Sequence, residues 1–181
     1  MTLFTTKIIQ AHIVRRNADA RFDRASNDAS SSQWQHLLLR RAASKRQFPN
    51  MWQVVTGTIE ESEPPLQTAF REVEEETGLV ASALWVMPHV GTFYDAVRDV
   101  MNLVPCFAAI FDHSPEISPH NTVTVRLSDE HSEYEWCNAE RAMQQLVIPS
   151  HIQGVETLER HILPLLMRGE IPVFARHPRE R

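Results

Sequence analysis

The chain has 181 residues, a formal net charge of −5 at pH 7 and a hydrophobic share of 43%. This length fits one globular domain with a substantial core. The acidic balance argues against a general nucleic-acid-binding protein, which needs a basic surface for its phosphate contacts. No apolar stretch approaches the roughly 20 residues of a membrane helix, and the N-terminus lacks a signal-peptide pattern, so we expect a cytoplasmic protein without membrane contact.

Apolar periodicity predicts, in chain order, strands over residues 7–15, 33–41 and 51–56, a helix over 64–77, strands over 84–94, 101–111, 122–127 and 134–138, and helices over 139–147 and 151–167. Pro164 predicts a bend or interruption in the last helix. Ser62 is placed to cap the first helix and Gly78 to end it. The polar stretch 17–32 has hardly any large apolar residue and predicts a mobile loop.

The order of these elements predicts a fold class. Strands before and after one central helix, with two helices at the end, indicate an α/β protein with a mixed β-sheet in an α/β/α sandwich. We expect residues 1–168 to form one domain and residues 169–181, with their prolines and mixed charge, to form an irregular tail. Cys106 and Cys137 lie inside expected strands without metal-ligand spacing, which favours buried, reduced thiols.

The segment from Gly57 to Leu79 carries the strongest functional signal. Glu72, Glu75 and Glu76 occupy positions i, i+3 and i+4 of the expected helix, so their carboxylates lie on one face. Such a group can hold Mg²⁺, which takes oxygen ligands from a few carboxylates, waters and substrate phosphates. The alternative is a solvent-exposed helix face, which is what an isolated run of glutamates usually forms.

The full spacing over residues 57–79 resembles the Nudix box at every defined position, namely Gly57, Glu63, Arg71, Glu72, Glu75, Glu76 and Gly78, with the expected aliphatic residues after Glu72 and after Gly78. The resemblance implies the Nudix fold and a metal-dependent hydrolase that cleaves a diphosphate linkage. It also implies that Glu72, Glu75 and Glu76 bind Mg²⁺, with Mn²⁺ as a substitute. The backbone carbonyl of Thr56 is then expected to complete the coordination.

Other box positions are expected to support the metal ligands. Arg71 is cationic and cannot bind the metal, so we expect it to orient Glu72 or to pair with Glu63. We expect Gly57 to form a tight turn over the start of the helix. Glu74 occupies the free position of the pattern and turns away from the shared face, so we assign it no role.

A second acidic cluster follows the expected strand 122–127. By resemblance to Nudix enzymes, Glu130 is the better candidate for a further metal ligand or general base and Glu133 the second, while an exposed acidic turn is the alternative. The segments Trp52-Gln53 and Glu130-His131, the latter followed by Tyr134-x-Trp136, resemble bacterial dihydroneopterin triphosphate pyrophosphatases. Which of Glu72, Glu130 and Glu133 acts as the base stays open.

Four further side chains are candidates for binding substrate. Trp52 and Gln53 could line the site, although a lone tryptophan more often packs in the core. Arg40 and Arg41 could meet the phosphates, and solvated surface charge is the alternative. The histidines show no two-histidine spacing on a helix, so the sequence predicts no zinc site.

We therefore expect hydrolysis of dihydroneopterin triphosphate or a related nucleoside triphosphate, with release of pyrophosphate. The alternatives are a nucleotide-sugar or dinucleotide pyrophosphatase and, in a different class, a Nudix module that senses a nucleotide without hydrolysing it. The expected partner is a small phosphorylated substrate and not a nucleic-acid polymer. A homodimer is the default oligomeric state.

Overall fold

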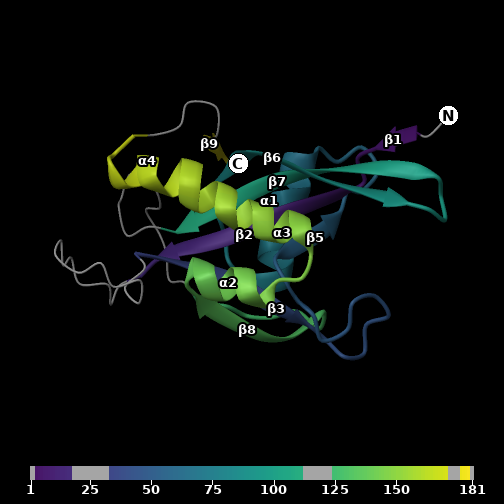
Figure 1. Cartoon of the computed structure of the whole chain (residues 1–181), viewed down its shortest axis with the longest axis horizontal. Helices are drawn as coiled ribbons and strands as arrows, with labels where there is room; N and C mark the ends of the chain where they lie inside the picture. The colour runs from purple at the N-terminus through teal and green to yellow at the C-terminus, as the bar shows by residue number, and fades with distance from the viewer. Residues whose placement is uncertain (1–2, 18–32, 112–123, 171–175, 180–181) are drawn as a thin grey trace.

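The computed structural model describes residues 3–17, 33–111, 124–170 and 176–179. Within these ranges, nine strands form one mixed sheet with helices packed on both faces (Figure 1). The strands are β1 (Leu3–Thr5), β2 (Ile8–Arg16), β3 (Trp34–Arg41), β4 (Trp52–Gln53), β5 (Val55–Thr58), β6 (Ala83–Asp95), β7 (Val100–Phe111), β8 (His131–Cys137) and β9 (Arg176–Pro178). The helical segments are α1 (Pro65–Thr77), α2 (Ala139–Gln145), α3 (Pro149–Thr157), the π-helical turn η2 (Leu158–Ile162) and α4 (Leu163–Met167). This architecture confirms the predicted α/β sandwich.

Strand β2 is central, since it pairs in parallel with β7 and antiparallel with β3 and β5. Its side chains alternate between the two faces of the sheet. Ile9, Ala11 and Ile13 pack in the cluster beneath α1. Gln10 and His12 point to the other face, where the Gln10 amide donates a 2.6 Å hydrogen bond to His12 Nε2. A shift of one residue would exchange the two faces, so this pattern specifies the register.

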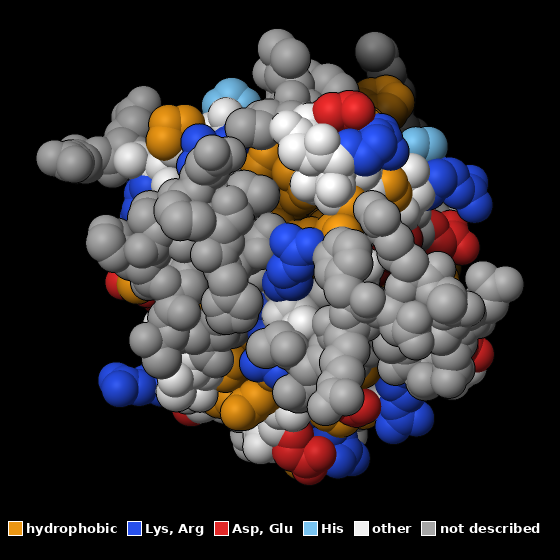
Figure 2. Space-filling view, turned by 90° about the vertical axis from the view of Figure 1, so that its left-hand side faces the viewer, with side chains coloured by type: hydrophobic (Ala, Val, Ile, Leu, Met, Phe, Trp, Pro, Cys, Tyr) orange, Lys and Arg blue, Asp and Glu red, His pale blue; other side chains and the backbone are white. Residues whose placement is uncertain are grey.

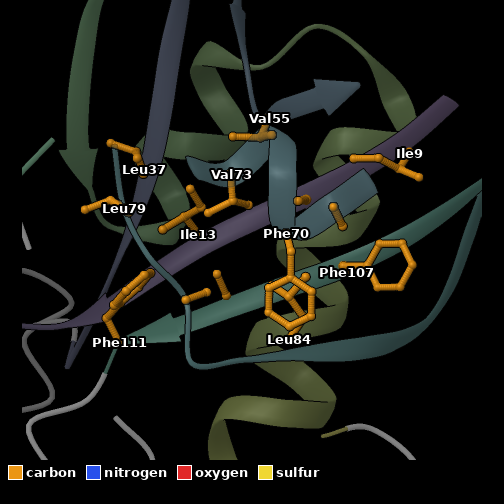
Figure 3. Close-up of a cluster of buried hydrophobic side chains, with 14 of the residues drawn as sticks. Ile9, Ile13, Leu37, Val55, Phe70, Val73, Leu79, Leu84, Phe107 and Phe111 are labelled. Atoms are coloured by element: carbon orange, nitrogen blue, oxygen red, sulfur yellow. The ribbon is translucent and has the colours of Figure 1, made fainter. Parts of the chain in front are cut away.

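Helix α1 packs on the sheet through one apolar face. Ala69, Phe70 and Val73 are buried in the core cluster that also holds Ile13 and Leu84. Figure 3 shows Phe70 and Val73 directed at these sheet side chains. The glutamates of α1 occupy the remaining circumference of the helix, so the core contacts determine where those carboxylates point.

The sequence predicted the C-terminal end of α1 correctly but not the residue that caps its N-terminal end. Gly78 ends the helix in the left-handed region, with φ 68°, and its N–H donates to the Glu74 carbonyl at 2.7 Å, which confirms its predicted role. The prediction for Ser62 is wrong, because Pro64 is the N-cap and makes no side-chain cap bond. Pro65 follows at the first helical position, where a proline fits because the first turn has N–H groups without helical partners.

The opposite face of the sheet is covered by α3, η2 and α4. Leu158, Ile162 and Leu163 pack there against Trp85. The Leu163 N–H bonds to the Leu158 carbonyl, five residues back, immediately before Pro164, which has no N–H to continue an α-helical ladder. The predicted interruption near this proline is therefore confirmed.

The predicted strand 122–127 is wrong over the residues that the structure describes. Residues 124–127 form no strand, and residues 122 and 123 lie outside the described ranges. The Arg126 N–H donates to the Thr77 carbonyl at 2.7 Å and the Ser128 N–H to the Glu76 carbonyl at 3.2 Å. The segment thus satisfies carbonyls at the C-terminus of α1, which have no partner inside the helix.

The prediction of an irregular tail is wrong at β9. Arg176–Pro178 pairs antiparallel with β6, with His177 opposite Leu84. Because β9 is the last strand on that side, its proline removes no bond that a further strand would need. Strand β1, which the sequence did not predict, pairs in parallel with β7.

Further predictions concern the loop, the cysteines and the surface. The expected loop 17–32 lies outside the described residues except for Asn17. Cys106 and Cys137 are buried and free, as predicted.

No helix among the described residues has the length and apolar character to cross a membrane. Figure 2 shows basic, acidic and apolar side chains interspersed over one face.

Candidate functional site

Gly57 and Glu72 set the distance between β5 and α1. A Cβ atom at Gly57 would lie 2.1 Å from Glu72 Cγ and 2.4 Å from its Oε1. Left-handed glycine conformations occur at Gly78 and Gly169 but not at Gly57. The predicted tight turn at Gly57 is therefore wrong. Glycine is needed there because the Glu72 side chain occupies the space that another side chain would fill.

Arg71 joins three carboxylates on the outer side of α1. Its guanidinium bonds both oxygens of Glu63, at 3.1 and 2.9 Å, Glu72 at 2.8 Å and Glu75 at 3.1 Å. The Thr58 carbonyl accepts a further bond at 3.1 Å. The Arg71 guanidinium lowers the pKa of Glu63 to about 2. Both partners that the sequence predicted for Arg71 are thus present, and Glu75 is a third.

Glu76 is the buried carboxylate of the group, with 3% of its surface exposed. Burial raises its pKa to about 9, and the charges of Glu72 and Glu130 add to this effect against the opposing charge of Arg41. Neither of its carboxylate oxygens has a hydrogen-bond partner among the described residues. Burial also raises the pKa of Glu72, whereas Arg71 acts to lower it. The carboxylates with a raised pKa are therefore Glu72 and Glu76, and the charge of Glu130 acts on both.

Two arginine–glutamate pairs link β3 to the start of β8. Arg41 Nη1 lies 2.5 Å from Glu130 Oε2, and Arg40 Nη1 lies 2.9 Å from Glu133 Oε1. The Arg41 side chain is the more buried of the two arginines, at 19% exposed against 36%. The structure therefore places Arg41 and Glu130 close enough for their charges to act on Glu76, while the second pair is the more exposed.

The two predicted substrate contacts of β4 are packed within the fold. Trp52 packs, partly buried, against the cluster beneath α2. Gln53 is 4% exposed, and its amide donates a 3.1 Å hydrogen bond to His131 Nε2. The prediction that Gln53 contacts substrate is corrected, because its amide is used inside the fold.

His131 is the residue that sequence reasoning missed. Its Nε2 lies 3.8 Å from Glu76 Oε2, and its side chain is fully buried. Burial lowers the pKa of His131 to about 4, with Arg41 and Lys45 acting in the same direction, so the imidazole is neutral around pH 7. The available signal was its position directly after Glu130, in a segment already noted for its acidic residues.

The carboxylates of Glu72, Glu76 and Glu130 are chemically suited to bind a hard divalent cation. They supply oxygen donors, and Glu76 has two buried oxygens without partners in the described chain. As the side chains stand, no three His, Cys, Asp or Glu side chains of the described residues are arranged as a metal-ligand group. Glu75 is instead paired with Arg71, and Glu130 with Arg41. Thr56, the predicted carbonyl ligand, lies in β5 opposite Gln10.

The sequence matches the NUDIX domain family model over residues 27–158, which is well over half of the chain. The chain therefore belongs to the NUDIX domain family, as the spacing of residues 57–79 predicted. Solved structures share the fold, and three of them illustrate it. One is a NUDIX hydrolase of Listeria monocytogenes, with 18% identity, a TM-score of 0.66 and coverage of 93% of this chain and 99% of that one.

The other two structures carry substrate names. An Ap4A hydrolase of C. elegans, in a binary complex, has 20% identity and a TM-score of 0.63, with 88% of this chain and 99% of that chain covered. The dihydroneopterin triphosphate pyrophosphohydrolase of E. coli has 23% identity and a TM-score of 0.54, with 84% and 96% covered. At these identities the likeness shows the fold, which confirms the predicted Nudix architecture.

Two curated relatives match part of the chain. An octanoyltransferase of Myxococcus xanthus is 33% identical over 125 residues, which are 68% of this chain and 31% of that protein. The asymmetrical bis(5'-nucleosyl)-tetraphosphatase of Mus musculus is 34% identical over 95 residues, which are 51% of this chain and 59% of that protein. The chain thus spans less than two thirds of the length of either relative.

Proposed function

We propose that this protein is a Nudix pyrophosphohydrolase that cleaves a phosphoric anhydride linkage in a nucleoside-polyphosphate-like substrate and needs a divalent cation. The observation that carries the proposal is Glu76, a buried carboxylate whose two oxygens lack partners in the described chain, beside Glu72 and Glu130. An unpaired buried carboxylate is costly unless a cation binds it. Such costs are typical of functional sites.

The proposed metal ligands are Glu72 and Glu76 of α1, the Thr56 carbonyl and Glu130. Glu75 joins them by leaving Arg71, which costs little because Glu75 is 59% exposed and such exposed pairs contribute little. Bound there, Mg²⁺, or Mn²⁺ in its place, neutralises phosphate charge and lowers the pKa of bound water. Glu72 and Glu130 are the candidates for the group that accepts a proton from the attacking water.

Arg41 is the proposed phosphate contact nearest to the carboxylates. A substrate phosphate competes with Glu130 for its guanidinium, because arginine binds phosphate and carboxylate with the same planar donors. The exchange would free Glu130 to act at the metal. Arg40 is a second phosphate contact in this proposal, at the outer pair with Glu133.

The leading substrate class is dihydroneopterin triphosphate or another nucleoside triphosphate, with pyrophosphate as a product. The segments around Trp52 and His131 support it through their resemblance to that subgroup. A dinucleoside polyphosphate is the second candidate, supported by the 34% identity to the mouse tetraphosphatase over 51% of the chain. The presence of every box carboxylate favours either enzyme over a module that only senses a nucleotide.

A substrate panel with Mg²⁺ or Mn²⁺ tests the proposal. The panel contains dihydroneopterin triphosphate, dATP, GTP, diadenosine tetraphosphate and ADP-ribose, and the products are separated by ion-exchange chromatography. Glu76→Gln should lower kcat by about 10³-fold or more, because it removes a charged metal ligand. Glu74→Gln is the matched control, because Glu74 lies on the same helix and pairs with Arg179 away from the site. No turnover of any substrate, or equal turnover by Glu76→Gln, would contradict the proposed function.

A further inference from the structure

Strand β8 lies at an edge of the sheet, where it pairs with β3 (Figure 1). Its side chains alternate between the two faces of the sheet. Glu135 accepts hydrogen bonds from Arg141 and Gln145 of α2, whereas Trp136 packs against the core cluster beneath α1. Tyr134 lies two positions before Trp136, so its side chain is on the face that α1 covers.

A β-bulge near the start of β8 brings a second side chain to this face. Three residues of β8 oppose two residues of β3 there, and Ser132 is the extra one. Because of this insertion, His131 and Tyr134 point to the same face although they are three positions apart. The 3.8 Å contact of His131 with Glu76 shows that this is the face of α1.

The proposed phosphate contact, Arg41, lies on the same face. It follows Leu39 by two positions in β3, and Leu39 belongs to the core cluster beneath α1 and pairs with Tyr134. The charge of Arg41 acts on the pKa of Glu76, so its guanidinium is close to a proposed metal ligand. Tyr134 is therefore a neighbour of the groups that would hold the phosphates of a substrate.

The ring of Tyr134 is open to solvent, at 45% exposed. The ring of Trp136 is covered instead, since the Arg15 guanidinium lies 4.3 Å from its centroid. Among the exposed aromatic residues of the described chain, Tyr134 belongs to the strand that also carries a contact of Glu76. An open aromatic ring beside a phosphate site is suited to stack on a heterocyclic base, because every base has an aromatic face.

An exposed tyrosine on a strand also has an ordinary explanation. Aromatic side chains fit a pleated surface, and single exposed apolar residues are normal. The position of Tyr134 distinguishes it from that case. On one side of Leu39, Gln53 of β4 is buried, at 4% exposed, whereas Tyr134 on the other side is open. A substrate whose phosphates lie at Arg41 thus meets the open surface of β8.

We propose that Tyr134 is a substrate-binding residue that stacks on the heterocyclic base of the nucleotide, while Arg41 and the metal hold its phosphates. The inference rests on the proposed function, because it takes the phosphates to bind at those groups. It assigns the preference for a polyphosphate that carries a base, over one that carries none, to a side chain outside the box segment.

Calorimetric titration in Ca²⁺ tests this role. Ca²⁺ is a hard cation that binds carboxylate and phosphate oxygens, so binding is measured apart from turnover. The probes are dATP, dihydroneopterin triphosphate and diadenosine tetraphosphate, with tripolyphosphate as the probe that has no base. Tyr134→Ala should raise Kd for the base-carrying probes that the wild type binds by about 10-fold or more, and Kd for tripolyphosphate by less than about twofold. Tyr134→Phe keeps the ring and should bind every probe within about twofold of the wild type.

Phe4→Ala is the matched control. Phe4 is also an exposed aromatic residue on a strand, at 71% exposed, and its strand β1 pairs with β7 and not with β3. Its removal should leave Kd for every probe within about twofold of the wild type. If Tyr134→Ala does not fold, Tyr134→Thr takes its place, because threonine removes the ring and suits a strand.

Unchanged affinity of the folded variant without the ring for every nucleotide would overturn the inference. An equal loss for tripolyphosphate would overturn it too, because the base would then not be what Tyr134 contacts. A loss in Tyr134→Phe as large as in Tyr134→Ala would assign the effect to the hydroxyl and overturn stacking, and so would a wild type that binds no nucleotide. Hydrolysis in Mg²⁺ is read separately. Wild-type protein that binds nucleotides through Tyr134 but hydrolyses none would contradict the proposed function alone.

Discussion

Glu72 lies so close to Gly57 that a methyl group at position 57 would fall 2.1 Å from the Glu72 Cγ atom. The glycine is therefore required by its neighbour and not by its own backbone angles. Gly57→Ala should displace Glu72 from its bond with Arg71 and, since displacements of about 1 Å cost about 10²-fold, lower kcat by that order. Steady-state hydrolysis measures this loss.

A double-mutant cycle separates this contact from a backbone effect. In the wild-type background Gly57→Ala should cost about 1–3 kcal/mol of unfolding free energy, the usual range for overpacking. In a Glu72→Ala background the same change should cost less than about 0.5 kcal/mol, because the space is then open. Equal costs in both backgrounds, measured by urea unfolding, would show that the contact with Glu72 is not the reason for glycine.

The pair of Arg71 with Glu63 gives a second prediction. Arg71→Lys should lower the free energy of unfolding by about 1–2 kcal/mol, because lysine cannot make the two-pronged contact with both Glu63 oxygens. Arg98→Lys is the control, since its pair with Asp95 is an exposed one, with Arg98 77% exposed, and should change stability by less than about 0.5 kcal/mol. Thermal melts that shift equally for both variants would contradict this ranking.

How far the sequence predicted the site depends on the range of the interactions. Local ones were predictable: the helical spacing placed Glu72 and Glu76 on one face, and Gly78 ended α1 as expected. The orientation of Glu75 was not, because its turn toward Arg71 is a choice of rotamer on an exposed side chain. The burial of His131 depends on β4 and α1, which lie far from it in the chain, so its own neighbours in the sequence could not indicate it.

The same distinction explains the errors in the fold. Residues 122–127 are rich in β-branched side chains and predict a strand. In the structure the Arg126 N–H instead bonds the Thr77 carbonyl at the end of α1. Carbonyl groups at the end of a helix have no partner inside the helix, and a segment distant in the sequence can bond them. A local sequence pattern does not indicate such a contact. The pairing of Arg176–Pro178 with β6 is likewise a long-range contact. The proline in this segment argued against a strand, so the sequence did not predict it.

Glu76 is expected to destabilise the protein when no metal is bound. Its pKa is raised from 4.5 to about 9 by burial, so folding keeps it protonated while the unfolded chain ionises above about pH 4.5. Below about pH 4.5 the Glu76 carboxyl is protonated in both the folded and the unfolded chain. As the pH rises toward 9 only the unfolded chain ionises, so the free energy of unfolding falls. In EDTA, Glu76→Gln should therefore be more stable than the wild type by about 1–3 kcal/mol, with a gap that widens between about pH 6 and pH 8.

Addition of Mn²⁺ should close or reverse this gap, because binding to the folded wild type stabilises it by mass action. Glu74→Gln serves as the control and should show neither the gain in EDTA nor a changed response to Mn²⁺, since Glu74 is 44% exposed in its pair with Arg179. Melts in EDTA that place Glu76→Gln below the wild type would contradict the burial argument.

The histidines beneath α3 predict acid sensitivity on the other face of the sheet. Burial holds the pKa of His12 well below its ordinary value, and His151, His36 and His89 add to this. Burial alone lowers the pKa of His151 to about 4. A Cβ atom at Gly154 would lie 2.1 Å from His12 Nε2, so α3 packs directly on that ring. Protonation of either ring would place a charge in this buried layer.

The sign of the pH effect follows from these depressed pKa values. The unfolded chain binds protons below about pH 6.5, whereas the folded chain keeps His12 and His151 neutral. The stability they contribute is therefore full above about pH 6.5 and falls at lower pH, and for His151 it is lost as the pH falls toward 4. His151 should account for about 1 kcal/mol of unfolding free energy between about pH 6.5 and pH 5.5. His151→Gln should remove about one such share from the pH dependence measured by urea unfolding, while His177→Gln, on the exposed strand β9, should leave it unchanged. An identical slope in His151→Gln and the wild type would mean that His151 is not the titrating group.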